Sequence, residues 1–182
     1  MPDEARLERT ENGLVPRDGG WFVVNAADTP WWQSGTFGAS TSFEGEGEAA
    51  FPELGMNIHV LWPGQPNGLY HQDSAQEDFL VVSGECLVLI EGEERRLKAW
   101  DFVHCPGGTD HIFVGAGDGP CVIVMAGSRA PSTILYPVSE LADRHGAGAK
   151  EETTVPREAY APFDIGGAGP MPNGALTGAQ RS

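Results

Sequence analysis

Apolar residues alternate with polar or small residues in short runs along the middle of the chain. The clearest run, Leu54–Trp62, has an apolar residue at every second position and stops at the turn signal Pro63-Gly64. Similar runs, separated by glycine-rich connections, predict strands at Gly20–Asn25, Thr36–Phe43, Phe79–Val82, Cys86–Glu91, Arg95–Lys98, Asp101–Cys105, His111–Gly115 and Cys121–Ala126. Many short strands at a spacing of about ten residues indicate an all-β sandwich or barrel.

The two ends of the chain differ from this middle. Only Ser139–His145 has the pattern of a short helix, with Ser139 as its N-cap and Gly146 just past its end. Tyr160 and Phe163 are candidates to anchor the chain that follows the helix across the barrel. We expect a polar N-terminal arm at 1–18, a barrel at 19–138, a short helix and packed tail at 139–165, and a disordered tail at 166–182.

The charge of the chain is unevenly distributed. There are 26 acidic and 11 basic side chains, a formal charge of −15. From Asp18 to Glu94 there are 13 acids and no Lys or Arg, so one segment carries nearly all of the imbalance. A solvated acidic surface explains such a segment, and a region that favours a cation is the alternative. Nucleic acid and anionic membranes are poor partners, because both rely on Lys and Arg to replace counterions.

The sequence also predicts the compartment. No apolar run approaches the roughly 20 residues that a membrane-spanning helix needs. The first residues include acids where a signal peptide needs a basic region and an apolar stretch, so we expect a cytoplasmic protein. Cys86, Cys105 and Cys121 lack a CxxC spacing and lie in apolar stretches, which predicts buried free thiols.

Two stretches carry the residues that suggest chemistry. In the first, His71 and Asp73 are two residues apart, so they point to the same face of an extended segment, and Glu77 opens an apolar strand. In the second, a turn with Pro106 delivers His111 to the start of a strand. If the two strand pairs face each other, two imidazoles and one or two carboxylates converge. Such a 2-His-1-carboxylate site suits Fe(II), with Mn, Ni, Co or Zn also possible.

These residues resemble the cupin superfamily, small jelly-roll barrels with two sequence motifs. The family's first motif is Gly, five residues, His-x-His, three or four residues, Glu, six residues and Gly, and this sequence matches it at His71, Asp73, Glu77 and Gly84. The second motif contains Pro-x-Gly, two residues and His, and the matching positions are Pro106, Gly108 and His111. The resemblance covers about Leu54 to Gly127. It implies a cupin-type double-stranded β-helix, here with one short C-terminal helix.

The sequence departs from the family pattern at several positions. Asp73 replaces the second histidine of the first motif, and Gly64 stands one residue away from the position of its first Gly. In the second motif, Trp100 replaces the first Gly and Gly115 replaces the final Asn. The resemblance implies one divalent transition metal ion per chain, with Fe(II) favoured and Mn, Zn, Ni or Co possible. Its ligands would be His71, Glu77 and His111, with Asp73 as a fourth ligand or as a group beside them.

The same resemblance indicates an activity. An open metal site binds dioxygen and a chelating substrate or acts as a Lewis acid. By resemblance, a metal-dependent oxygenase is the first choice, with lyase or isomerase chemistry next, and its catalytic residues would be His71, Glu77 and His111. A non-catalytic cupin that binds a small molecule or a metal is one alternative. Another is a metal-free, sugar epimerase-like cupin, in which His71 and Asp73 transfer protons. His59 is either a group facing the cavity or a packed strand residue.

The charge distribution predicts the kind of substrate, and the edge strands predict the oligomeric state. A phosphorylated substrate needs several cations, and these would have to come from Arg95, Arg96, Lys98 or Arg129. The substrate is therefore expected to be a small neutral or weakly anionic organic molecule. A jelly roll leaves edge strands, which natural proteins cover or pair. With the resemblance, this predicts a homodimer to which Gly20–Phe43 contributes strands.

Overall fold

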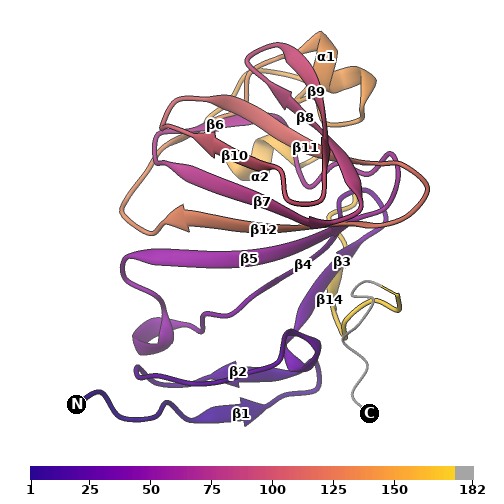
Figure 1. The fold of residues 1–182 in the computed structure, drawn as a ribbon. Helices are drawn as coiled ribbons and strands as arrows, with labels where there is room; N and C mark the ends of the chain where they lie inside the picture. The colour runs from indigo at the N-terminus through magenta and orange to yellow at the C-terminus, as the bar shows by residue number, and fades with distance from the viewer. Residues whose placement is uncertain (175–182) are drawn as a thin grey trace.

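Two facing antiparallel sheets and a separate hairpin make up the fold (Figure 1). The structure is a computed structural model that describes residues 1–174. The larger sheet has the order β10-β7-β12-β5-β4-β3-β14, with β3 Trp31–Ser34, β4 Gly38–Ser42, β5 Leu54–Leu61, β7 Glu77–Ser83, β10 Phe102–Cys105, β12 Cys121–Ser128 and β14 Gly167–Gly169. The smaller sheet has the order β13-β6-β11-β8-β9, with β6 His71–Asp73, β8 Glu85–Ile90, β9 Glu93–Lys98, β11 Asp110–Ala116 and β13 Ile134–Leu135.

The predicted all-β class is confirmed, and every strand predicted from Thr36 to Ala126 corresponds to an observed strand. The strand predicted at Gly20–Asn25 is wrong. Trp21 forms only an isolated bridge with Glu4, and the Asn25 side chain accepts a hydrogen bond from Ala27 N at the start of the 3₁₀ helix η1 (Ala26–Asp28). The helix cap therefore ends the extended segment.

The hydrophobic core lies between the two sheets. Its largest cluster combines residues from both sheets: Leu61, Phe79, Val81, Cys86, Val88, Cys105, Phe113, Cys121, Ile123 and Met125. The register of β5 with β12 pairs Asn57 with Met125 and His59 with Ile123. Polar Asn57 and His59 therefore point to the barrel interior, while the apolar alternation predicted for this strand forms its outer face.

The C-terminal part follows the prediction at first and then departs from it. Helix α1 (Glu140–Arg144) is confirmed, with the Ser139 hydroxyl accepting from Ala142 N and Gly146 in the left-handed region just past the end. A second short helix, α2 (Pro156–Ala159), is an addition to the one helix that was predicted. It begins with a proline at its first position, where the missing N–H has no helical partner.

The prediction of disorder from residue 166 does not hold for β14. This strand pairs with β3, and side chains of β3 hold the chain around it, because Trp32 Nε1 donates to Ile165 O and Gln33 Nε2 donates to Pro170 O. These contacts are not visible in glycine-rich composition. The rest of the predicted tail, residues 175–182, lies outside the described residues.

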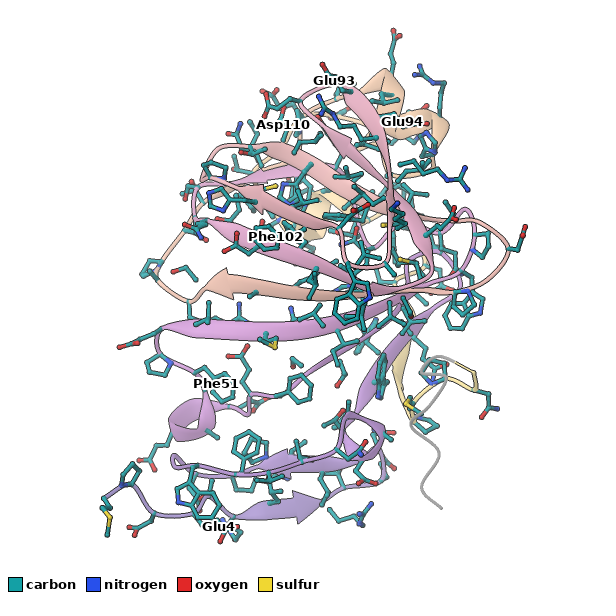
Figure 2. The ribbon with its side chains drawn as sticks, viewed as in Figure 1. Glu4, Phe51, Glu93, Glu94, Phe102 and Asp110 are labelled. Carbon is teal, nitrogen blue, oxygen red and sulfur yellow. The ribbon has the colours of Figure 1, made fainter. Side chains whose placement is uncertain are left out.

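The N-terminal arm forms a hairpin of β1 (Leu7–Arg9) and β2 (Leu14–Pro16), on the side of the barrel away from α1 (Figure 1). Phe51, after the 3₁₀ helix η2 (Gly47–Ala49), lies between β5 and this hairpin (Figure 2). Its ring centroid is 6.2 Å from that of Phe22, so the two rings join the arm to the barrel. In residues 1–174, every helix is too short or too polar to cross a membrane.

Candidate metal centre

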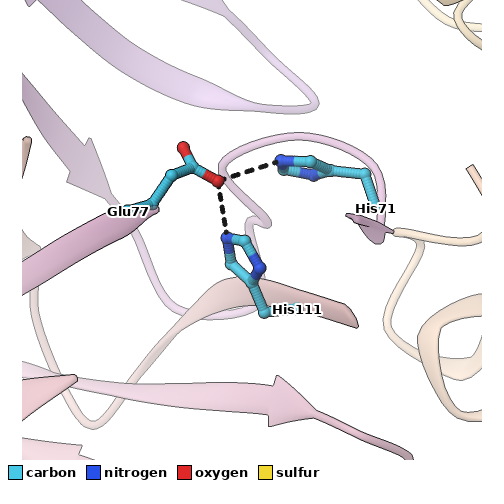
Figure 3. A group of neighbouring side chains, drawn as sticks. All are labelled: His71, Glu77 and His111. Carbon is cyan, nitrogen blue, oxygen red and sulfur yellow. Dashed lines mark ion pairs between the residues drawn. The ribbon is translucent and has the colours of Figure 1, made fainter. Parts of the chain in front are cut away.

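Three side chains from three strands meet inside the barrel (Figure 3). His71 opens β6 and is paired with His111 of β11, whereas Glu77 opens β7 in the facing sheet. His71 Nε2 lies 3.9 Å and His111 Nε2 lies 3.4 Å from the same oxygen, Glu77 Oε2. The three atoms lie within 4.8 Å of one another, so the fold brings these predicted site residues together.

The backbone fixes the second ring nitrogen of each histidine. His71 Nδ1 lies 2.8 Å from the Leu69 carbonyl oxygen, and His111 Nδ1 lies 3.0 Å from that of Thr109. A carbonyl oxygen only accepts, so each Nδ1 carries a proton and donates it. In the neutral imidazole, the Nε2 that faces Glu77 then has a free lone pair. Metal-binding histidines are oriented by the same kind of hydrogen bond.

The third group, Glu77, has a buried oxygen. Its Oε2 has no hydrogen-bond partner in the described part of the chain. Burial raises the pKa of Glu77, but the contact with His111 and the positive charges of His111, His71 and Arg129 outweigh it and hold the pKa below its usual value. Burial and the neighbouring His111 lower the pKa of His71, which favours its neutral form. When His111 is protonated it pairs with Glu77, and when both imidazoles are neutral the carboxylate faces two Nε2 lone pairs, an arrangement that a cation satisfies in place of the proton.

Asp73, the fourth predicted ligand, is not part of this group. One carboxylate oxygen accepts from Ala75 N at 2.7 Å, and the other accepts from Ser132 Oγ at 3.3 Å. The hydrogen bond from Ala75 N, two residues later, is that of an Asx-turn, which is common for aspartate and fixes the position of this short side chain. The compact group that the structure shows therefore consists of His71, Glu77 and His111, without Asp73.

Other candidate residues lie elsewhere. His59 faces the interior from β5, where burial lowers its pKa to about 4 and its Nδ1 has no partner among residues 1–174. His104 pairs with Asp78 at 2.6 Å on the outer face of β10 and β7. Cys105 is opposite Glu77, and burial raises the pKa of its thiol to about 12, so it is a packed, unreactive thiol.

Two tyrosines from the C-terminal part support the site, which the motifs did not indicate. The Tyr160 hydroxyl accepts a hydrogen bond from Leu69 N at 3.0 Å, and the carbonyl of Leu69 orients His71. The ring of Tyr136 lies 6.0 Å, between centroids, from that of His71. From the sequence we predicted only that Tyr160 anchors the tail, because Leu69 and Tyr160 are 91 positions apart and no local pattern reveals their contact.

The group is partly accessible. The side chains of Glu77 and His71 are 26% and 18% exposed, whereas that of His111 is 3% exposed. A groove of about 380 Å³ lies further along the same sheet and includes Ser40, Ser42 and Asn57 in its lining. Glu77 and His71 are thus in contact with solvent, whereas His111 is buried.

Comparison with known proteins agrees with this geometry. A model of the cupin domain matches residues 57–127, which include His71, Glu77 and His111. A search of curated proteins gives no match. The polyketide cyclase RemF from Streptomyces resistomycificus is similar in structure, with 14% identity, a TM-score of 0.52, and 62% of this chain and 83% of that chain covered. That likeness supports the same fold for this chain.

Two further structures are similar at a lower level. A sugar phosphate isomerase of the cupin superfamily from Silicibacter pomeroyi has 25% identity and a TM-score of 0.45, over 52% of this chain and 63% of that chain. The DMSP lyase DddQ from Ruegeria pomeroyi has 23% identity and a TM-score of 0.46, over 75% of this chain and 64% of that chain. The chain thus spans less than two thirds of the length of either protein.

Proposed function

Because the chain belongs to the cupin superfamily, we propose that it is an enzyme whose barrel holds one divalent transition metal ion with His71, Glu77 and His111. The observation that carries the proposal is the buried Glu77 Oε2, which faces two Nε2 lone pairs and no donor in the described chain. Two imidazoles and one carboxylate are the ligand set of non-haem Fe(II) sites, and Mn, Zn, Ni or Co also accept it.

With only three protein ligands, a bound ion would keep coordination positions for a substrate. Three protein ligands leave open positions at which a bound ion activates dioxygen or acts as a Lewis acid on an organic molecule. The protein's part is to keep both Nε2 atoms unprotonated, through Leu69 and Thr109, and to admit the substrate on the exposed side of Glu77. Oxygenation is the first candidate reaction, and a lyase or isomerase reaction is the second.

The alternatives remain distinct. A non-catalytic cupin would bind the ion or a small molecule without turnover. The metal-free proton-transfer alternative needs Asp73 beside His71, but the Asp73 carboxylate is held by Ala75 and Ser132. The geometry therefore favours the metal site.

Metal content tests the proposal. Protein purified without chelator should contain close to one transition metal ion per chain, and His111→Ala should lose it because His111 is the most buried of the three side chains. His104→Ala is the matched control, since this histidine pairs with Asp78 on the outer face and should leave the metal content unchanged. Absence of metal from the wild type, or full occupancy in His111→Ala, would overturn the proposal.

Turnover is tested on the metal-loaded protein. Oxygen consumption with Fe(II) and a panel of catechols, thiols and β-dicarbonyls tests for an oxygenase. Mass spectrometry of the same mixtures without oxygen detects lyase or isomerase products. A metal-loaded protein that changes none of these compounds in either assay would favour the non-catalytic alternative.

A further inference from the structure

On the inner face of the larger sheet, two glycines, Gly127 and Gly55, lie in a row next to Glu77. Gly127 of β12 is paired with Glu77 of β7 on one side and with Gly55 of β5 on the other. Neighbouring strands are about 4.8 Å apart, so Glu77 and Gly55 are separated by roughly two strand spacings. At Gly127, in the middle of this row, the sheet presents only backbone atoms.

Arg129 covers the far end of the row. A Cβ on Gly55 would overlap the Arg129 guanidinium, so this position requires glycine for Arg129 to lie there. Arg129 Nε donates to Glu44 Oε1 at 2.9 Å, and Nη2 donates to the same oxygen. The other Glu44 oxygen accepts from Phe51 N at 3.3 Å. The guanidinium is thus held against the sheet at a fixed place.

This guanidinium retains free donors. An arginine has five N–H donors, and Glu44 accepts only two of those of Arg129. Its Nη1 has no hydrogen-bond partner within residues 1–174, and its side chain is 30% exposed. The planar fork of the two Nη atoms matches a carboxylate. Arg95 and Arg96 each bind one carboxylate oxygen in the same way, but they lie on the exposed strand β9, away from the inner face.

The space between Arg129 and Glu77 lies over Gly127, which is half-buried. A Cβ at Gly127 would meet Glu77 Cγ at 3.7 Å and Oε1 at 3.8 Å, which is ordinary van der Waals contact. The fold therefore does not require glycine here for packing, and the missing side chain leaves room. Asn57, two residues from Gly55 on the same face, has a buried Oδ1 with no partner in the described chain.

We propose that Arg129 is a specificity-determining residue that binds the carboxylate of a small organic acid lying over Gly127, with the acid's other end at the His71–Glu77–His111 group. Binding of one end of the acid at the His71–Glu77–His111 group rests on the proposed function, whereas binding of its carboxylate by Arg129 does not. One guanidinium whose charge is partly offset by Glu44 favours a monoanionic carboxylate over a phosphate dianion.

Binding of dicarboxylates tests this proposal without turnover. The probes are the α,ω-dicarboxylates from oxalate to adipate and the monocarboxylates of equal length, titrated into Co(II)-loaded protein and followed by the visible absorption of Co(II). At least one dicarboxylate should bind more tightly than its monocarboxylate, and Arg129→Gln should lose that preference by about tenfold or more. Arg96→Gln, which removes an exposed arginine paired with Glu85, is the matched control and should keep it.

Gly127→Ala provides a second variant that should fold. It should still bind Co(II) but should lose dicarboxylate binding, because its methyl group fills the space beside Glu77. Equal dicarboxylate affinity in wild type, Arg129→Gln and Gly127→Ala would overturn the inference.

A metal-free arm separates this inference from the proposed function. Without metal, succinate should shift the Arg129 Nε–H resonance of the wild type, and an unshifted resonance would count against Arg129. Failure of the wild type to bind Co(II) would instead overturn the proposed metal site and leave this resonance as the measurement that decides the role of Arg129.

Discussion

Protonation of His59 should destabilise the fold in acid. Its Nδ1 is buried on the inner face of β5 without a partner in the described chain, and burial lowers its pKa to about 4. Its register neighbours are Ile123 on β12 and Ser40 on β4, so no carboxylate stands directly across to stabilise an imidazolium. We predict that His59→Leu removes a defined part of the pH dependence of stability.

The sign and size follow from the two pKa values. A histidine in an unfolded chain has a pKa of about 6.5, so between that pH and the folded pKa the unfolded chain binds more protons. The free energy of unfolding therefore falls as the pH falls through this window. With a pKa of about 4 in the folded state, protonation of His59 lowers the free energy of unfolding by roughly 2 kcal/mol between pH 7 and pH 4.5.

Urea unfolding at pH 7, 6, 5 and 4.5, with chelator present, measures this contribution. The stability of wild type minus that of His59→Leu should fall by the amount given above, and other titrating groups cancel in the difference. Asn57→Leu is the matched control, because it removes a neighbouring polar side chain of the same face that does not titrate. If wild type and His59→Leu lose the same stability over this range, the assigned burial of His59 is wrong.

Three further predictions concern support of the site and assembly. Tyr160→Phe removes the acceptor of Leu69 N and should lower the free energy of unfolding by about 1 kcal/mol and weaken metal binding; unchanged metal affinity would show that this contact does not orient the site. Gly107→Ala should destabilise by about 1–3 kcal/mol in urea unfolding, because its Cβ would overlap the Ser74 carbonyl oxygen; wild-type stability would contradict this. Light scattering should give the mass of a homodimer, and a monomer at all concentrations would refute that prediction.

The strands could be predicted where periodicity and turn residues agree. The long strands between Thr36 and Ala126 satisfy both, whereas β6 and β13 are too short to show a period. Periodicity did not settle which face of β5 is inside, because Leu54, Met56 and Ile58 form an apolar outer face. β14 could not be predicted, because the chain around it is held by hydrogen bonds from Trp32 and Gln33 of β3, more than 130 residues earlier in the sequence.

The candidate site was predictable in part for a related reason. His71, Glu77 and His111 could be named from motif spacing; the register of β6 with β11 places the two histidines side by side, and the facing sheet brings Glu77 to them. Asp73 satisfied the same rule of alternating faces, yet its carboxylate accepts hydrogen bonds from Ala75 N and Ser132 Oγ and is not part of the group. Spacing predicts the face on which a side chain lies, but local hydrogen bonds decide what its atoms contact.

Two residues of the acidic segment, Glu44 and Glu77, have contrasting surroundings in the fold. Glu44 and Glu77 both belong to the run from Asp18 to Glu94 that has no Lys or Arg. Glu44 receives the Arg129 guanidinium from outside that run, whereas Glu77 Oε2 has no donor within residues 1–174. Arg129 therefore pairs directly with Glu44, whereas Glu77 has the charge of Arg129 nearby but no hydrogen bond on its buried Oε2. Because a buried carboxylate oxygen without a direct partner is unfavourable, the free energy of this arrangement falls when a cation binds between Glu77 and the two imidazoles.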